Sequence, residues 1–153
     1  MEDQLLETWL IHDRINRYLL NAIPEEALGS ALGPKHRTVY QLFAHLHNVR
    51  LMWLKAAAPE LLSGLTKLEG TDGDKDALAK TLEASGQAIA ALLRKALAAG
   101  GKVKGFKPHV VAFLGYLISH ESHHRGHIGW TLKNTGHPLD QKTAYGLWEW
   151  GVR

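Results

Sequence analysis

The sequence predicts an all-α protein, a four-helix bundle with a short extra helix at its C-terminal end. Three observations indicate this fold class. Apolar residues recur at helical spacing in four long segments, capping residues, prolines or glycines bound these segments, and no segment has a strong strand signal. Four long helices with loops of this size favour a bundle over a globin-like or solenoid arrangement. We expect residues 1–153 to form one domain, because this length buries a sufficient core without disulfides.

The first two expected helices are bounded by clear local signals. The first covers residues 3–23, where an approximate stripe of apolar side chains runs up to Pro24. The second covers residues 38–58 and is followed by another proline. It opens with Thr38 and, three residues later, Gln41, which is the pattern of a capping box. We therefore expect a well-defined start for the second helix.

A long connection separates the second helix from the third. Residues 59–75 contain three glycines and few periodic apolar positions, so we expect a loop with one short turn of helix. The third helix is expected over residues 76–99, where alanine, leucine, lysine and glutamate dominate the composition. The pair Gly100-Gly101 is a natural end for this helix.

The fourth expected helix is the longest and runs from Pro108 to Thr135. Proline suits the first position of a helix, and Gly136 is a natural stop. At about 1.5 Å per residue this helix is about 40 Å long, enough to cross the whole domain. The last segment begins at Asp140, a candidate N-cap, and extends through Trp150. We expect it to form a short fifth helix packed on the bundle.

Composition and charge exclude several classes of function. The chain has no cysteine, so any metal ligands must be His, Asp, Glu or water. The net charge is only +3, and the one basic cluster (Lys102, Lys104 and Lys107) lies in a loop without a reading helix, so we expect no nucleic-acid partner. The acidic start and the lack of an apolar run of about 18 residues predict a soluble, cytoplasmic protein without a membrane partner.

The most informative stretch is residues 120–127, which hold four of the ten histidines. On a helix that advances about 100° per residue, His120 and His124 share one face. The same reasoning places His45 on the flank of the apolar stripe of the second helix. Imidazole is the commonest protein ligand for transition metals, and a cation would satisfy lone pairs that burial deprives of water. We expect these three histidines to bind one divalent metal ion; the alternative is that they are surface or hydrogen-bonded residues without a metal.

Glu121 gives this stretch a second interpretation, because with His120 and His124 it forms the string H-E-x-x-H. In zinc peptidases the glutamate of this motif is the general base. The match is short, the glycine and third histidine of the longer metzincin form are absent, and no strand is evident to align a peptide. Glu121 points into the expected apolar stripe, where we expect an ion pair with Arg125. A metallopeptidase is therefore a minor alternative.

Four more side chains near the cluster have expected roles. His47 and His123 fall toward the polar side of their helices and are expected at the surface. His127 is the candidate for a catalytic proton carrier, for orienting a ligand or for a fourth ligand; a hydrogen-bonded flank residue is the alternative. Tyr116 lies one turn before the cluster, where it lines the same pocket or packs in the core.

Two motifs resemble those of the DinB family, which overlaps the wider DinB/YfiT-like metalloenzyme superfamily. Residues 42–50 (LFAHLHNVR) resemble the second-helix motif of the family, whose histidine matches His45. Residues 120–128 (HESHHRGHI) resemble its fourth-helix motif, whose two ligands match His120 and His124. The helix order and the long second connection also agree, so the likeness covers nearly the whole chain.

The resemblance implies a four-helix bundle with one divalent ion, often nickel or zinc, on three histidines, and frequently a homodimer. The family includes thiol-dependent transferases and a hydrolase-like relative, maleylpyruvate isomerase, besides many members without an assigned reaction. The expected function is thus a metal-dependent transferase or hydrolase for a small-molecule substrate, with or without a low-molecular-weight thiol. The alternative is a non-catalytic, metal-stabilised, stress-associated binding protein. His127, where many members carry Gln, leaves the coordination number open, because a closed structural site has four protein ligands.

Overall fold

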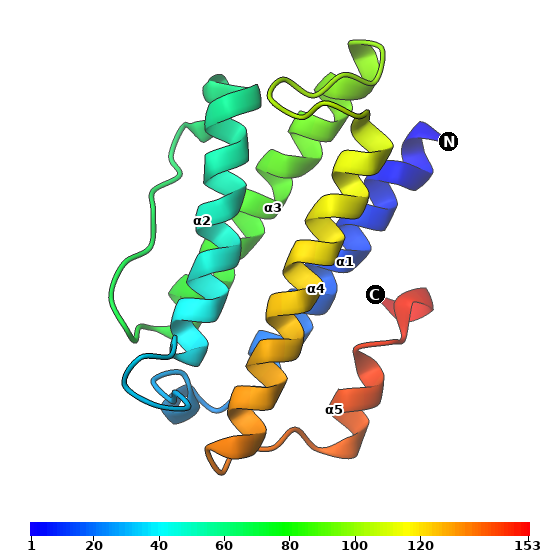
Figure 1. Cartoon of the computed structure of the whole chain (residues 1–153). Coiled ribbons are helices and arrows are strands. Elements are labelled where there is room, and N and C mark those ends of the chain that lie inside the picture. The colour runs from blue at the N-terminus through cyan, green and yellow to red at the C-terminus, as the bar shows by residue number, and fades with distance from the viewer.

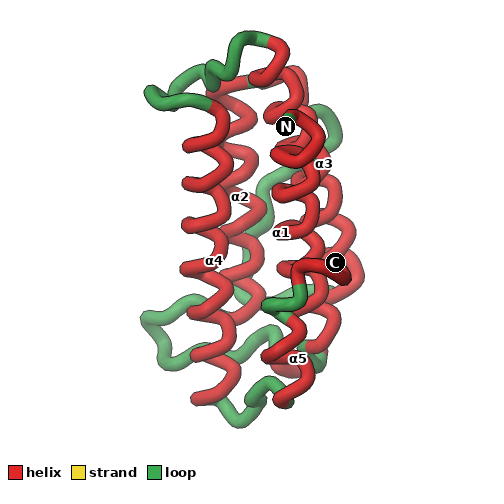
Figure 2. Tube along the Cα trace, turned by 90° about the vertical axis from the view of Figure 1, so that its right-hand side faces the viewer, coloured by secondary structure: helices red, strands yellow, loops and turns green.

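Four long helices lie side by side in the computed structural model, which describes all 153 residues, and a short fifth helix packs near the C-terminus (Figure 1). No β-sheet is present, as the red helices and green loops of Figure 2 show. None of the helices has the length and apolar character needed to cross a membrane. The predicted bundle is therefore confirmed. The α-helices are α1 (Glu2–Ala22), α2 (Val39–Ala57), α3 (Lys75–Ala98), α4 (Val110–Asn134) and α5 (Gln141–Gly146), and the 3-10 helices are Glu25–Ala27, Pro59–Leu62 and Trp150–Val152.

The starts of α2 and α4 show which local signals set the helix boundaries. The capping box is confirmed: the backbone N–H of Gln41 donates to Thr38 Oγ1 (3.0 Å), and the backbone N–H of Thr38 donates to Gln41 Oε1 (2.9 Å). The predicted start of α4 at Pro108 is wrong. The N-cap is His109, whose Nδ1 accepts a hydrogen bond from the backbone of the first turn (3.2 Å), so α4 begins at Val110.

The C-terminal segment is less helical than expected. Asp140 is the N-cap of α5, as predicted, and its side chain accepts a hydrogen bond from the backbone of Thr143 (2.7 Å). However, α5 ends at Gly146, and a separate 3-10 turn follows at Trp150–Val152. The segment is fixed to α1 mainly at its end, where the Arg153 guanidinium lies 3.7 Å from the ring centroid of Tyr18.

The connection between α2 and α3 returns along the outside of α2, so these two helices run parallel (Figure 1). Two side chains of α2 hold it. His47 Nε2 lies 2.7 Å from the carbonyl oxygen of Thr66, and the amide of Asn48 pairs with both backbone groups of Leu68 at 2.9 Å. The prediction that His47 is at the surface is therefore wrong, because the connection covers it completely. A helical wheel does not include such a covering segment.

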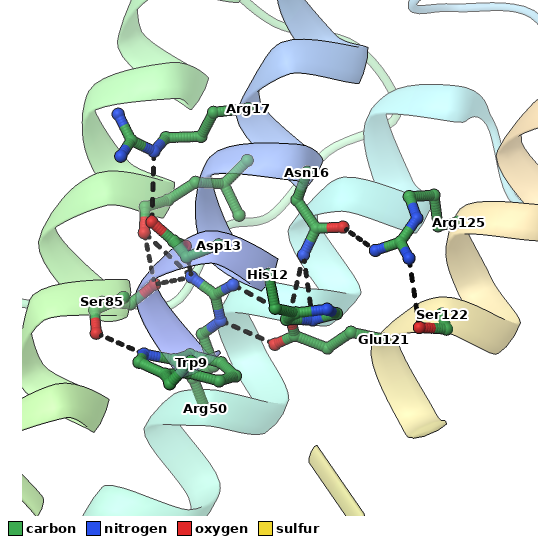
Figure 3. A network of polar contacts seen from close by, with 12 residues as sticks. Trp9, His12, Asp13, Asn16, Arg17, Arg50, Ser85, Glu121, Ser122 and Arg125 are labelled. Carbon is green, nitrogen blue, oxygen red and sulfur yellow. Dashed lines mark hydrogen bonds and ion pairs between the residues drawn. The ribbon is translucent and has the colours of Figure 1, made fainter. Parts of the chain in front are cut away.

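A buried polar layer separates two apolar clusters of the core. One cluster contains Trp9, Leu54 and Phe113, and the other contains Phe43 and Ile128. The side chains of the layer come from all four long helices and are drawn in Figure 3. Its members, none more than 1% exposed, are His12, Asp13, Asn16, Arg50, Ser85 and Glu121.

The centre of this layer is an ion pair between Arg50 of α2 and Glu121 of α4 (Figure 3). Arg50 Nε donates to Glu121 Oε1 (2.7 Å) and Nη2 donates to Oε2 (2.9 Å), while Nη1 lies 3.0 Å from Asp13 Oδ1. Glu121 Oε2 also accepts from the Asn16 amide (2.8 Å) and lies 2.9 Å from His12 Nε2. Burial alone would raise the pKa of Glu121, but the charge of Arg50 lowers it to about 2, so the carboxylate is ionised.

The prediction that Glu121 pairs with Arg125 is wrong, but the prediction that Glu121 points into the core is confirmed. Arg125 lies on the same helix, but its Nη1 donates to Asn16 Oδ1 (2.7 Å). Arg50 occupies the bundle interior that Glu121 faces, so the interhelical pair replaces the expected pair within one helix. Because the pair has two parallel hydrogen bonds, it fixes α4 in one rotation and one register relative to α2.

Gly86 of α3 tests how tightly this layer is packed. A Cβ atom added there would lie 2.5 Å from Asp13 Oδ1, and the Asp13 carboxylate is held by Arg17 as well as by Arg50. We expect Gly86→Ala to lower the free energy of unfolding by about 1–3 kcal/mol in urea denaturation, because the buried carboxylate has no free space.

The matched control for this prediction is Gly115→Ala in α4. A Cβ atom at Gly115 would have no neighbour within 4 Å, so alanine should raise the free energy of unfolding by about 0.5–1 kcal/mol through its helix propensity. Equal effects of the two substitutions would contradict tight packing around Asp13.

Candidate metal centre

Three histidines converge where α2 faces α4. Each of His45, His120 and His124 offers one ring nitrogen, and these three nitrogens all lie within 4.8 Å of one another. The ring centroids of His45 are 5.2 Å from His120 and 4.4 Å from His124, and the two rings on α4 are 4.7 Å apart. Such a group could hold a metal ion.

The local sequence explains why these rings meet. His120 and His124 are one turn apart on α4, so they project on the same side of the helix. Glu121, next to His120, is locked to Arg50, and Arg50 follows His45 by five residues on α2. The buried ion pair therefore aligns the two helix segments that carry the three imidazoles.

The imidazoles are held in their neutral form. Burial, followed by the nearby charge of Arg37, lowers the pKa of His45 to about 4. Burial and the neighbouring imidazoles lower the pKa of His124 to about 4, and burial also lowers that of His120. At neutral pH the lone pairs that a cation needs are thus available without loss of a proton.

Two buried nitrogens of this group have no partner in the protein. The Nδ1 atoms of His120 and His124 are inaccessible to solvent and make no hydrogen bond. Buried polar atoms without a partner are uncommon in native proteins. A donor set of three neutral imidazoles fits zinc, nickel or copper, and the residues present thus fit a divalent transition metal.

The other side chains of the cluster lie outside the three-histidine group. His123 is exposed, as predicted, and its ring centroid is 5.0 Å from that of His124. His127 is also exposed; its ring centroid is 6.4 Å from that of His123. Tyr116 is 38% exposed and stacks on His120, with an interplanar angle of 15°, so it borders the site instead of packing fully in the core.

A cavity of about 420 Å³ opens beside His45, between α2 and the connection to α3. This cavity was not predicted from the sequence, because its outer wall comes from residues 67–70 of the connection. The polar layer was also missed, although His12 and Asn16 interrupt the apolar stripe of α1 one turn apart and were a usable signal. The cavity wall includes Arg37, Gln41, Ala44, Asn48, Lys67 and Glu69.

This arrangement provides neutral nitrogen ligands and an adjoining cavity, but it does not leave Glu121 free as a base. The carboxylate is 1% exposed and its two oxygens are engaged by Arg50, Asn16 and His12. The glutamate of an H-E-x-x-H peptidase has to reach a water molecule on the metal. The geometry therefore gives no support to the peptidase alternative.

The pKa values of the site predict how the metal-free protein responds to acid. Between about pH 6.5 and pH 4 the unfolded chain binds protons on histidine, whereas native His45 and His124 resist protonation until the pH nears 4. The free energy of unfolding should therefore fall as the pH is lowered through this window, as measured by urea denaturation with a chelator present.

Substitutions separate the contribution of His45 and His124 to this pH dependence from that of other buried groups, such as His47. His45→Gln should flatten the pH dependence, and His127→Gln, which removes an exposed histidine that is not among the causes of the lowered pKa values, should leave it unchanged. The same slope in His45→Gln as in the wild-type protein would contradict the assignment.

Comparisons with known proteins agree with the fold and with the predicted family. The model of the DinB family matches residues 1–150. A DinB-like protein from Bacillus cereus has a similar crystal structure (TM-score 0.65, 20% identity, covering 90% of this chain and 95% of that one). One from Bacillus subtilis is comparably similar (TM-score 0.62, 20% identity, 90% and 96%). No curated protein matches significantly. Because the family model spans nearly the whole sequence, the chain belongs to the DinB family.

Proposed function

We propose that the protein is a metal-dependent enzyme that binds one divalent cation through His45, His120 and His124. The observation that carries this proposal is the convergence of three imidazole nitrogens within 4.8 Å on two helices fixed by a buried ion pair. The neutral state of the rings adds support, because their lone pairs are available to a cation.

The group has three protein ligands, which favours an open site over a closed one. No carboxylate and no fourth histidine belongs to the group of close ligand atoms, and the chain has no cysteine. Structural zinc sites have four protein ligands, whereas catalytic sites have three and leave a position for water or substrate. The adjoining cavity of about 420 Å³ offers room for a small-molecule substrate.

The chemistry we propose is activation of a nucleophile for a transferase or hydrolase reaction. A divalent cation held by His45, His120 and His124 would lower the pKa of a water or thiol bound to it and so supply a nucleophile near neutral pH. The ligands are held neutral and aligned by the protein. Exposed His127, three residues after His124, is our candidate for the proton carrier between the site and solvent.

The family resemblance extends this proposal to properties beyond the site. We propose nickel or zinc as the native ion, a low-molecular-weight thiol as the co-substrate in the transferase case, a cytoplasmic location and a homodimer. The homodimer is accessible to sedimentation analysis at several protein concentrations, independently of the metal.

Metal analysis of protein purified without a histidine tag tests the site. After loading with Ni²⁺ or Zn²⁺ and removal of excess ion, we expect about one ion per chain in the wild-type protein. His124→Ala should lose most of the bound ion, because two imidazoles hold a cation far less tightly than three. The metal-dependent turnover of electrophiles with low-molecular-weight thiols should be lost in the same variant.

Two further variants are the controls. His123→Ala removes an exposed histidine from the same helix and should retain about one ion per chain. His127→Ala should also retain the ion but slow turnover. Loss of the ion in His127→Ala would indicate a closed site with four ligands and the non-catalytic alternative, and an unchanged metal content in His124→Ala would contradict the ligand assignment.

A further inference from the structure

Two neighbouring cavities lie on the side of the connection, and they share Arg37 and Gln41. The first, of about 420 Å³, includes His45 in its wall. The second, of about 400 Å³, extends from there along residues 31–38, before α2. Arg37 thus lines both cavities, and a ligand that extends from one into the other would contact it.

The walls of the cavity beside His45 carry an excess of positive charge. Arg37 and Lys67 are cationic, Glu69 is the only acidic residue, and Lys35 adds another cation in the second cavity. Neither Arg37 nor Lys67 forms an ion pair with a carboxylate of the chain. In contrast, Arg50 is compensated by two carboxylates. The charge at the cavity is therefore free to attract an anion.

The two cations come from separate parts of the chain, but the fold holds these parts together. Thr38, next to Arg37, donates its hydroxyl to the carbonyl oxygen of Thr71 (2.6 Å). Asn48 pairs with the backbone of Leu68, next to Lys67, through two hydrogen bonds of 2.9 Å. The backbone on both sides of the cavity is thus fixed, so a ligand would not have to order it on binding.

The cavity beside His45 brings Arg37 close to the proposed metal site. Arg37 and His45 both line it, so one small molecule in the cavity can contact Arg37 and the ion that His45 would hold.

We propose that the cavity beside His45 binds the carboxylate of a small organic acid through Arg37, with Lys67 as a second cation, while the other end of the acid reaches the three-histidine site. Arginine pairs with a carboxylate through two parallel hydrogen bonds. One acidic side chain against two cations suits a singly charged carboxylate better than a doubly charged phosphate. This inference names the substrate class of the proposed enzyme and rests on its metal site.

A pair of thiols that differ only at the far end tests the inference without any activity measurement. The protein is loaded with Co²⁺ and titrated with 3-mercaptopropionate or with its neutral amide, 3-mercaptopropionamide. The thiolate–cobalt absorption band reports binding of the sulfur end of both compounds. We expect the carboxylate to bind at least about fivefold more tightly than the amide in the wild-type protein, as for a charge-assisted hydrogen bond.

Arg37→Gln should reduce this preference toward one, because it removes the carboxylate partner but none of the three histidines. Arg94→Gln is the matched control: Arg94 is an exposed arginine of α3 that lines neither cavity, and its loss should leave the preference unchanged. Comparison of the preference ratios cancels the attraction of the cobalt ion for any anion.

The outcomes separate the two proposals. If cobalt binds and both thiols give the band, but the preference is the same in Arg37→Gln as in the wild-type protein, the anion site is wrong and the metal site stands. If no cobalt binds, or if His124→Ala gives the same band, the proposed function fails and the inference fails with it.

Discussion

The buried ion pair between Arg50 and Glu121 is the constraint on which the rest of the structure depends. Removal of two charges from water costs several kcal/mol for each ion, and only a well-formed set of partners offsets that cost. Here the partners come from all four long helices, since Asp13, Asn16 and Ser85 complete the set (Figure 3). All of these hydrogen-bond and charge partners are in place in only one arrangement of the bundle. The ion pair therefore favours that arrangement over others that would bury the same apolar surface.

The same arrangement produces the site. Along α4 the ion-pair residue lies directly after the first of the two histidines, and along α2 the arginine follows the third by five residues. Once Arg50 meets Glu121, the imidazoles meet as well. Burial that stabilises the core also keeps the three rings uncharged, as the lowered pKa values of His45 and His124 show. The ion-pair residues and the proposed metal ligands thus lie on the same two helices and depend on the same helix alignment.

Most of the fold and the three histidines followed from the sequence because helical periodicity is a local property. The spacing of His120 and His124 and the capping box at Thr38 need no knowledge of the neighbouring helices. The wrong predictions concern residues whose environment depends on contacts between segments far apart in the sequence. His47 is covered by the connection between α2 and α3, and Glu121 faces Arg50 across the bundle. The cavity beside His45 was invisible for the same reason, because a loop without periodicity forms its wall.

The most direct test of the central claim is X-ray absorption spectroscopy of the wild-type protein loaded with one equivalent of Ni²⁺ or Zn²⁺. We expect a first coordination sphere with three imidazole nitrogens at about 2.0–2.1 Å and at least one further oxygen from solvent. Multiple scattering from the imidazole rings counts those ligands directly. A sphere with four imidazoles, or with fewer than three, would contradict an open site built on His45, His120 and His124.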